Sequence, residues 1–227
     1  MAVFISGPAL APALYDAAFS ANSWEKIISA CQQNKVPETW AIGDSKAMTI
    51  NGADYLVDII GKNHDSYSDG TGEAPLTFQL RSCYATDNKM NGSHTNAGGW
   101  GACNMRTTHL PAILALMPSE VRTGIRQVNK LTGVQSIINT TADKLFLLSE
   151  VEIFGTAGYS TSGEGTQYAY YAANNGTVKY KSGVSTNWGA RSPMDGNGDS
   201  FCAVNTSGGA DVFGAADAIG VAFAFCF

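Results

Sequence analysis

Residues 220–227 constrain the fold more than any other segment of this chain. As an extended strand they place Val221, Phe223, Phe225 and Phe227 on one face and smaller side chains on the other. Four large apolar side chains on one face would promote aggregation if they were exposed, so we expect them to be buried. A buried strand here holds the preceding loops on a rigid platform, and loops on such platforms commonly carry binding specificity.

Composition narrows the class of protein. The 227 residues are 44% hydrophobic and 15% charged, which is enough apolar material for one large domain with a real core. Twenty-five glycines indicate a loop-rich mixed fold. The net charge of -5 comes without any basic stripe, so nucleic acid is excluded as a partner. No apolar run reaches the roughly 20 residues of a membrane-spanning helix, so no membrane span is expected.

The chain divides at residue 22. Residues 1–22 are predicted to be an N-terminal arm or attachment segment, and residues 23–227 a single ligand-binding domain. The start is apolar, but no Lys or Arg precedes Lys26, and Pro8 and Pro12 interrupt the apolar stretch. A clear signal peptide is therefore not predicted, and we expect synthesis in the cytoplasm.

The five cysteines are odd in number and irregularly spaced, unlike a disulfide framework or a zinc ribbon. We interpret them as small buried thiols in a chain made under reducing conditions. The five residues are Cys31, Cys83, Cys103, Cys202 and Cys226.

Hydrophobic periodicity predicts helices and strands in mixed order. Ser23 opens an amphipathic helix that ends near Asn34, and Asn51-Gly52 joins two alternating runs as a β-hairpin. Two helices in the middle with strands on either side predict an α+β fold rather than βαβ repeats. The further segments are a strand at 76–80, helices at 105–116 and 118–128, a strand at 144–148 continued through 149–154, a turn at 167–172, strands at 201–204, 211–213 and 220–227, and long loops at 63–73 and 91–99.

Five motifs in this order resemble an uncharacterised domain family of phage tail proteins and bacterial surface proteins. That family is similar to the C-type-lectin-like fold shared with formylglycine-generating enzymes. The resemblance runs from about Trp24 to the end and implies mixed antiparallel sheets, two to three helices and long loops. The motifs are Asn96-Ala97-Gly98-Gly99-Trp100 with Asn104-Met105-Arg106-Thr107, residues 144–155, Glu164-Gly165-Thr166-Gln167-Tyr168-Ala169-Tyr170, Asn187-Trp188-Gly189-Ala190-Arg191-Ser192-Pro193, and residues 220–227.

Some members of that family are variable proteins of diversity-generating retroelements, in which adenine-directed mutagenesis rewrites a C-terminal segment. Residues 188–227 resemble such a variable region, although Gly189 and Ala190 stand where bulkier residues are common. The resemblance implies a ligand-binding surface formed by Trp188, Ala190, Met194, Asp195, Asn197, Asp199, Ser200, Ala203, Asn205, Ala210, Asp211, Val212, Phe213, Ala215 and Asp217.

The composition of that segment fits binding but also fits a simpler role. Short polar residues offer adaptable hydrogen bonds and Phe213 offers an apolar contact, a mixture also found in antibody loops. The same Gly, Asn, Asp and Ser residues are equally typical of turns.

A calcium site is the one cofactor question left open. Residues 195–199 have the opening spacing of an EF-hand loop, but Ser200 stands where that loop needs Gly and Thr206 where it needs Glu. An EF-hand is therefore excluded, and a looser calcium site of these carboxylates stays open. No other metal or cofactor is expected.

Catalysis is the alternative to ligand binding. Cys103 and His109 could act as nucleophile and base, but a helix through this segment would separate them by about two turns. Cys202 and Cys226 lack the close spacing of an oxidative thiol pair. His64 and His94 lie in polar loops without neighbouring ligands. We therefore expect no enzyme, and an oxidase of the formylglycine-generating type is the third alternative.

Trp100 and Trp188 have two interpretations. Either ring could stack on a sugar, or both could be buried supports of glycine-flanked loops. The resemblance favours a receptor-binding adhesin at the tip of a phage tail fibre, and the runner-up is a bacterial cell-surface module. The expected partner is a bacterial surface protein or glycan, with other tail proteins meeting the N-terminal arm, and the expected location is a virion or a bacterial surface. A homo-oligomer stays open, since residues 1–22 show no heptad pattern.

Overall fold

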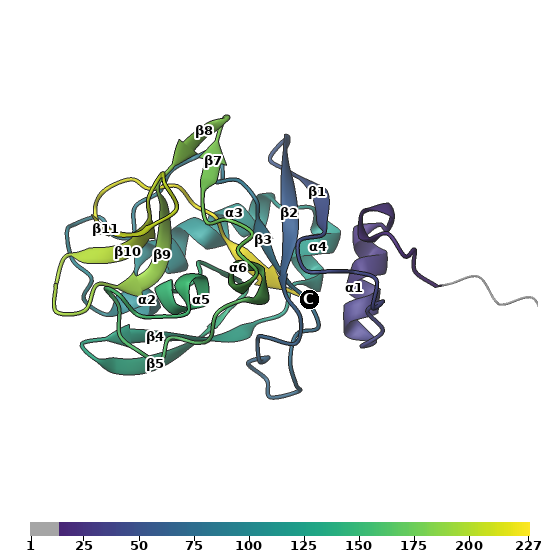
Figure 1. Ribbon diagram of the computed structural model, residues 1–227, viewed down its shortest axis with the longest axis horizontal. Coiled ribbons are helices and arrows are strands. Elements are labelled where there is room, and N and C mark those ends of the chain that lie inside the picture. Colours follow the sequence, from purple (N-terminus) through teal and green to yellow (C-terminus); the bar gives the residue numbers. More distant parts are fainter. Residues whose placement is uncertain (1–13) are drawn as a thin grey trace, which may run out of the picture.

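The computed structural model describes residues 14–227 and combines short helices with small antiparallel sheets in an α+β fold (Figure 1). In chain order the elements are the 3-10 turn η1 (Phe19–Ala21), α1 (Trp24–Gln32), β1 (Ser45–Ile50), β2 (Ala53–Gly61), β3 (Thr77–Leu80), α2 (Gly99–Ala102), the π-helical turn η2 (Met105–His109), α3 (Leu110–Leu116), α4 (Ser119–Gly124), β4 (Val128–Val134), β5 (Ile137–Asp143), β6 (Leu145–Phe146), α5 (Glu150–Phe154), α6 (Ala169–Ala172), β7 (Lys179–Lys181), β8 (Val184–Thr186), β9 (Trp188–Pro193), β10 (Ser200–Val204), β11 (Ala210–Gly214) and β12 (Ala224–Cys226).

The C-terminal strand lies inside the largest sheet of the described residues, whose order is β1-β2-β3-β12-β6. Strand β12 pairs antiparallel with β3 on one side and β6 on the other. Its regular pairing is confined to three residues, but the predicted burial is confirmed, because Val221, Phe223, Phe225 and Phe227 are all fully buried. Phe225 stacks on Phe78 of β3 with ring centroids 5.4 Å apart.

The local signals at the start of the domain are confirmed. The hydroxyl of Ser23 accepts a hydrogen bond from the amide of Lys26 and caps α1. Asn51 and Gly52 both take positive φ angles, 49° and 78°, in the tight turn that joins β1 to β2. Asn and Gly tolerate this backbone region at low cost, so the hairpin follows from its sequence.

The predicted N-terminal arm of residues 1–22 lies outside the described residues up to position 13. The part that follows packs on the domain. Tyr15 and Phe19 belong to the hydrophobic core, and the Phe19 ring meets Trp40 edge-on at 5.3 Å. The Nε1 atom of Trp40 donates to the carbonyl oxygen of Asp16 at 2.9 Å.

The two central helices are present, and the second is shorter than predicted. Residues 105–116 form one helical stretch of η2 followed by α3. Helix α4 ends at Gly124, where a Cβ atom would lie 2.8 Å from Ile28 of α1. The chain is extended beyond it, and the amide of Arg126 donates to the carbonyl oxygen of Cys226. Arg126 thus forms a β-bridge with Cys226, and this pairing explains why the predicted helix at 118–128 ends early.

The strand predicted through residues 149–154 is wrong, because these residues form helix α5. Ser149 and Glu152 form a reciprocal capping box at its start, and Gly155 ends it with a φ of 77°. The alternating sequence is typical of a strand, but both caps favour a helical turn.

The three-stranded sheet β11-β10-β9 lies at the end of the molecule opposite α1 (Figure 1). Hairpins β4–β5 and β7–β8 complete the sheets of the described residues. Within residues 14–227, every helix is too short or too polar to cross a bilayer.

Candidate functional site

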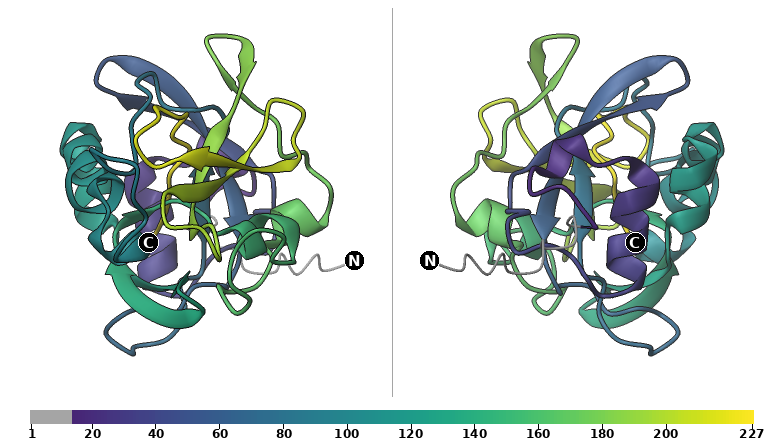
Figure 2. Two further views of the ribbon diagram at one scale, coloured as in Figure 1. Left: turned by 90° about the vertical axis from the view of Figure 1, so that its left-hand side faces the viewer. Right: turned by 90° about the vertical axis from the view of Figure 1, so that its right-hand side faces the viewer.

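The residues of the predicted binding surface divide into three groups by exposure. They come from the β9–β10–β11 sheet and its loops, which face the viewer in the left panel of Figure 2. The exposed members are Asp195, Asn197, Asp199 and Asp217; the half-buried members are Met194, Ser200, Asn205, Ala210, Asp211, Val212 and Phe213; and the buried members are Trp188, Ala190, Ala203 and Ala215.

The four buried members do not contribute to the exposed surface, which corrects their predicted place on it. Trp188 is fully buried, and its Nε1 atom donates to the carbonyl oxygen of Thr177 at 2.9 Å. Trp100 is fully buried as well and donates to Asp143 at 2.9 Å. Neither ring is available to stack on a sugar, and both support loops. Ala190 of β9, Ala203 of β10 and Ala215, which follows β11, are buried as well.

Asn96 holds the exposed loop of residues 194–200 in place. Its side-chain Nδ2 lies 2.6 Å from the carbonyl oxygen of Asn197 and 2.9 Å from that of Ser200, with a longer 3.4 Å contact to that of Met194. Its backbone amide donates to the carbonyl oxygen of Gly198 at 2.9 Å. All four acceptors are main-chain atoms, so this support does not depend on which side chains the loop carries.

Glu150 supports the same loop indirectly, through residues 158–160. Its buried carboxylate accepts hydrogen bonds from the backbone amides of Gly158, Tyr159 and Ser160 at distances of 2.8–3.1 Å. The carbonyl oxygen of Tyr159 in turn accepts the amide of Asp195 at 2.7 Å. This contact again uses main-chain atoms of the loop.

A hollow of about 560 Å³ lies beside the loop, lined by residues 96–98, 134–136 and 193–198. Its walls combine apolar side chains, such as Val134 and Met194, with the polar groups of Ser136 and Asp195. The size falls within the range typical of ligand pockets, roughly 300–1,000 Å³. Four other hollows of the described residues have volumes of about 260 to 450 Å³.

One wall of the hollow was not predicted from the sequence. It is the tip of the β4–β5 hairpin, where Gln135 and Ser136 have positive φ angles of 50° and 64°. Both angles lie in the left-handed region, in which residues other than Gly and Asn are strained. The next residue, Ile137, keeps 66% of its surface exposed. Strain and apolar exposure thus meet at the edge of the hollow, a combination often found at functional sites.

A buried ion network fixes the platform beneath the surface. The Lys130 ammonium lies 2.6 Å from carboxylate oxygens of both Asp65 and Glu152, and Arg191 of β9 contacts Glu152 at 2.5 Å. All four side chains are almost fully buried. Burial is the strongest single influence and would raise the pKa of Asp65, but the Lys130 charge and the hydrogen bonds from Lys130 and Thr77 together lower that pKa to about 2.

A second buried carboxylate lies next to this network. Glu164 accepts hydrogen bonds from the amide of Gly133 at 2.7 Å and from the hydroxyl of Ser192, and so joins β4 to β9. Burial raises the pKa of Glu164 to about 7, although these hydrogen bonds and Arg191 act in the opposite direction.

The acidic loop residues are engaged in local turns. Asp195 accepts the amide of Gly196, the side chain of Asn197 accepts the amide of Asp199, and Asp199 accepts the hydroxyl of Ser200. Across residues 14–227, no group of three or more His, Cys, Asp or Glu side chains is placed to hold a metal ion.

All five cysteines are buried and free, as predicted. Burial raises the pKa of the Cys103 thiol to about 11, so it is protonated at neutral pH. Burial and the neighbouring Glu150 raise the pKa of Cys202, and Cys226 lies against Asp65 and Thr77 instead. The two thiols that were rejected from the sequence as an oxidative pair thus occupy different surroundings.

Comparison with known proteins gives one family match. The model of a domain family of unknown function (DUF6273) matches residues 77–227. No curated protein and no solved structure matches the chain.

Proposed function

The chain belongs to the DUF6273 family of unknown function, and from this premise we propose that it is a non-enzymatic binding module. The module has a C-type-lectin-like fold and presents the exposed part of residues 194–217 to a protein or glycan on a bacterial surface. The matched region includes this surface, its supporting Asn96 and Glu150, and the hollow beside it.

One observation carries the proposal: the exposed loop is supported through its main chain. Asn96 donates to carbonyl oxygens of the loop, and Tyr159 accepts the amide of Asp195. Every residue except proline offers the same main-chain groups. Side chains at positions 195, 197 and 199 can therefore change without loss of these hydrogen bonds, as a diversified binding surface requires.

The proposed setting is the tip of a phage tail fibre whose C-terminal segment is rewritten by adenine-directed mutagenesis. A cell-surface module of a bacterium with the same fold is the alternative setting. The buried, protonated thiols support binding rather than thiol oxidation as the activity.

The test is a comparison of the gene and its flanks among related isolates. We expect substitutions to concentrate at exposed positions of the 194–217 segment and at adenines of a nearby template repeat. Asn96, Glu150 and Arg191 should stay fixed. Substitutions spread evenly between this segment and the rest of the chain would contradict a diversified surface.

A laboratory test uses two matched libraries displayed on yeast and challenged with protease. The first randomises the exposed positions Asp195, Asn197 and Asp199, and the second randomises the buried Asn96, Ser192 and Phe201. We expect most members of the first library to remain folded and most members of the second to be cleaved. Equal losses in both would show that the loop side chains are structural.

A further inference from the structure

The hollow points to the chemistry of the partner, and this inference rests on the proposed function. We propose that the hollow binds an apolar side chain of a protein segment rich in Lys and Arg. Protein segments of this composition, rather than glycans, would then be the natural ligands of the 194–200 loop.

The walls of the hollow provide a rigid apolar surface. Val134 packs directly on Gly99, where a Cβ atom would lie only 2.3 Å from the Val134 side chain. Pro193 lies against the same glycine, 3.4 Å from that Cβ position, and is itself buried. Gly99 therefore allows the hairpin tip and β9 to approach each other closely. Since the volume of about 560 Å³ exceeds that of a single side chain, the hollow admits a short segment of chain.

Apolar surface continues beyond the rim. Ile137 follows the lining residue Ser136 and is 66% exposed, and Tyr159, which accepts the amide of Asp195, is 41% exposed. Exposed aliphatic and aromatic side chains beside a pocket are typical of protein-binding surfaces.

The exposed charge of the 194–200 loop beside the hollow is negative. The segments 91–98, 133–138, 155–163, 194–200 and 205–219 contain no Lys or Arg. They carry Asp195, Asp199, Asp211 and Asp217, and their single histidine, His94, lies 3.9 Å from Asp217.

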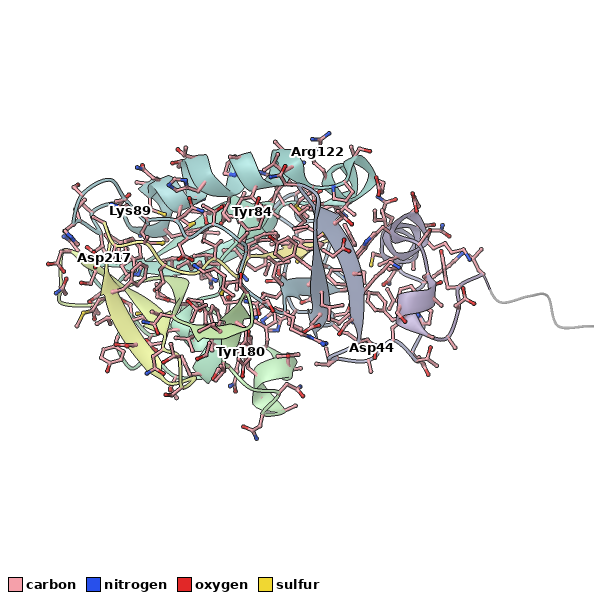
Figure 3. The ribbon with its side chains drawn as sticks, turned by 90° about the horizontal axis from the view of Figure 1, so that it is seen from above. Asp44, Tyr84, Lys89, Arg122, Tyr180 and Asp217 are labelled. Atoms are coloured by element: carbon pink, nitrogen blue, oxygen red, sulfur yellow. The ribbon has the colours of Figure 1, made fainter. Side chains whose placement is uncertain are left out.

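The nearest cation on β9, Arg191, is fully buried and paired with Glu152, so it does not offset these charges at the surface. Figure 3 shows Asp217 at the end of the molecule opposite α1. The exposed Lys89 lies at the same end (Figure 3), next to Asn88, whose backbone pairs with Ile219. A ligand at the 194–200 loop itself meets the carboxylates of Asp195 and Asp199, which favour a cationic partner and repel acidic ones.

Other ligand classes fit the surface less well. Sugar-binding sites commonly stack an aromatic ring on the sugar; Trp100 and Trp188 are both fully buried, which leaves only the partly exposed Tyr159 among the aromatic residues named at the rim. Phosphorylated and sialylated ligands are anionic and would be repelled by Asp195, which lines the hollow, and by Asp199 on the same loop. An apolar pocket with an acidic rim is instead complementary to a peptide that alternates Lys or Arg with Leu, Ile or Met.

The first experiment pans the purified full chain against a phage-displayed library of random 12-residue peptides. We expect enriched peptides to carry several Lys or Arg residues around an apolar residue. The dissociation constant of the best synthetic peptide is then measured by calorimetry at 50 and 500 mM NaCl. Screening of the charge pairs should weaken binding about tenfold at the higher salt.

Two double variants separate local from general charge effects. Asp195→Asn with Asp199→Asn should weaken binding of the selected peptide about fivefold or more. Glu38→Gln with Glu73→Gln removes the same net charge at exposed positions outside the hollow and should leave the affinity unchanged. A third variant, Met194→Lys, tests the apolar wall and should abolish binding.

Several outcomes would overturn the inference: no enriched peptide, enrichment of neutral or acidic peptides, or equal loss of affinity in both double variants. A panel of immobilised glycans distinguishes this failure from failure of the proposed function. Glycan binding that Met194→Lys abolishes would disprove the basic-peptide partner while keeping the binding role of the surface. A fixed 194–217 segment among isolates would count against the proposed function itself.

Discussion

The side-chain amide of Asn96 donates to the carbonyl oxygen of Asn197 at 2.6 Å, across 101 positions of the sequence. In Asn96→Ala the carbonyl groups of Asn197 and Ser200 lose this donor. We expect a loss of about 1–3 kcal/mol in the free energy of unfolding and faster exchange of the Asp195 amide. Urea denaturation and hydrogen–deuterium exchange measure the two effects.

The matched control is Asn175→Ala, which removes an exposed amide that bonds only to the nearby carbonyl of Tyr170. It should change the free energy of unfolding by less than about 0.5 kcal/mol. Unchanged exchange in Asn96→Ala would mean that the loop is held mainly through Tyr159.

Lys130→Met tests the buried ion network. The substitution keeps an unbranched side chain that is one atom shorter, but it leaves Asp65 and Glu152 without the ammonium that lies 2.6 Å from each. Breaking a buried ion pair from one side costs about 3–5 kcal/mol. The exposed Lys144→Met is the control and should be nearly neutral. A small effect at position 130 in chemical denaturation would show that both carboxyl groups become protonated instead.

Because of Glu164, the free energy of unfolding should fall as pH rises. Burial raises its folded-state pKa to about 7 from 4.5, so its protonated form is favoured in the folded chain. The contribution is fully present below pH 4.5 and is lost progressively as pH rises through about 7. The lost stability is on the order of 3 kcal/mol. Glu164→Gln stays neutral and should lack this component when urea denaturation is followed from pH 4.5 to 8.

Because other groups also titrate, the quantity to compare is the difference in unfolding free energy between Glu164→Gln and the unmodified chain at each pH. That difference should shift in favour of the variant as pH rises. A constant difference across the range would contradict the raised pKa.

Substitutions in the turn of the β4–β5 hairpin should raise the stability of the protein. Gln135 and Ser136 occupy left-handed backbone conformations that Asn and Gly adopt more easily. The double variant Gln135→Asn with Ser136→Gly should raise the free energy of unfolding by about 1 kcal/mol. Thermal unfolding would show this as a higher Tm. A lower Tm would mean that the native side chains make compensating contacts at the hollow.

Features with strong local signals could be predicted from the sequence. Asn51-Gly52 fixes a two-residue turn, Ser23 caps its helix, and alternation identifies the buried face of Phe223, Phe225 and Phe227. Each of these depends on residues close together in the chain, whose backbone preferences act without the rest of the fold.

Features that depend on distant contacts could not be predicted. The turn at Gln135 and Ser136 has neither Gly nor Asn, so nothing in the sequence marks the hairpin that forms one wall of the hollow. Asn96 is one polar residue in a polar loop, and only the folded chain brings it to Asn197. The sequence could not show whether Trp188 is buried or exposed, because a tryptophan beside a glycine occurs in both situations.

The position of β12 between β3 and β6 also affects protein synthesis. During translation, β3 and β6 emerge from the ribosome long before residues 224–226, and both keep an open edge until that segment arrives. Open strand edges recruit other chains. The nascent chain is therefore exposed to misassembly until residues 224–226 have left the exit tunnel, and slow elongation before this segment should raise its demand for chaperones.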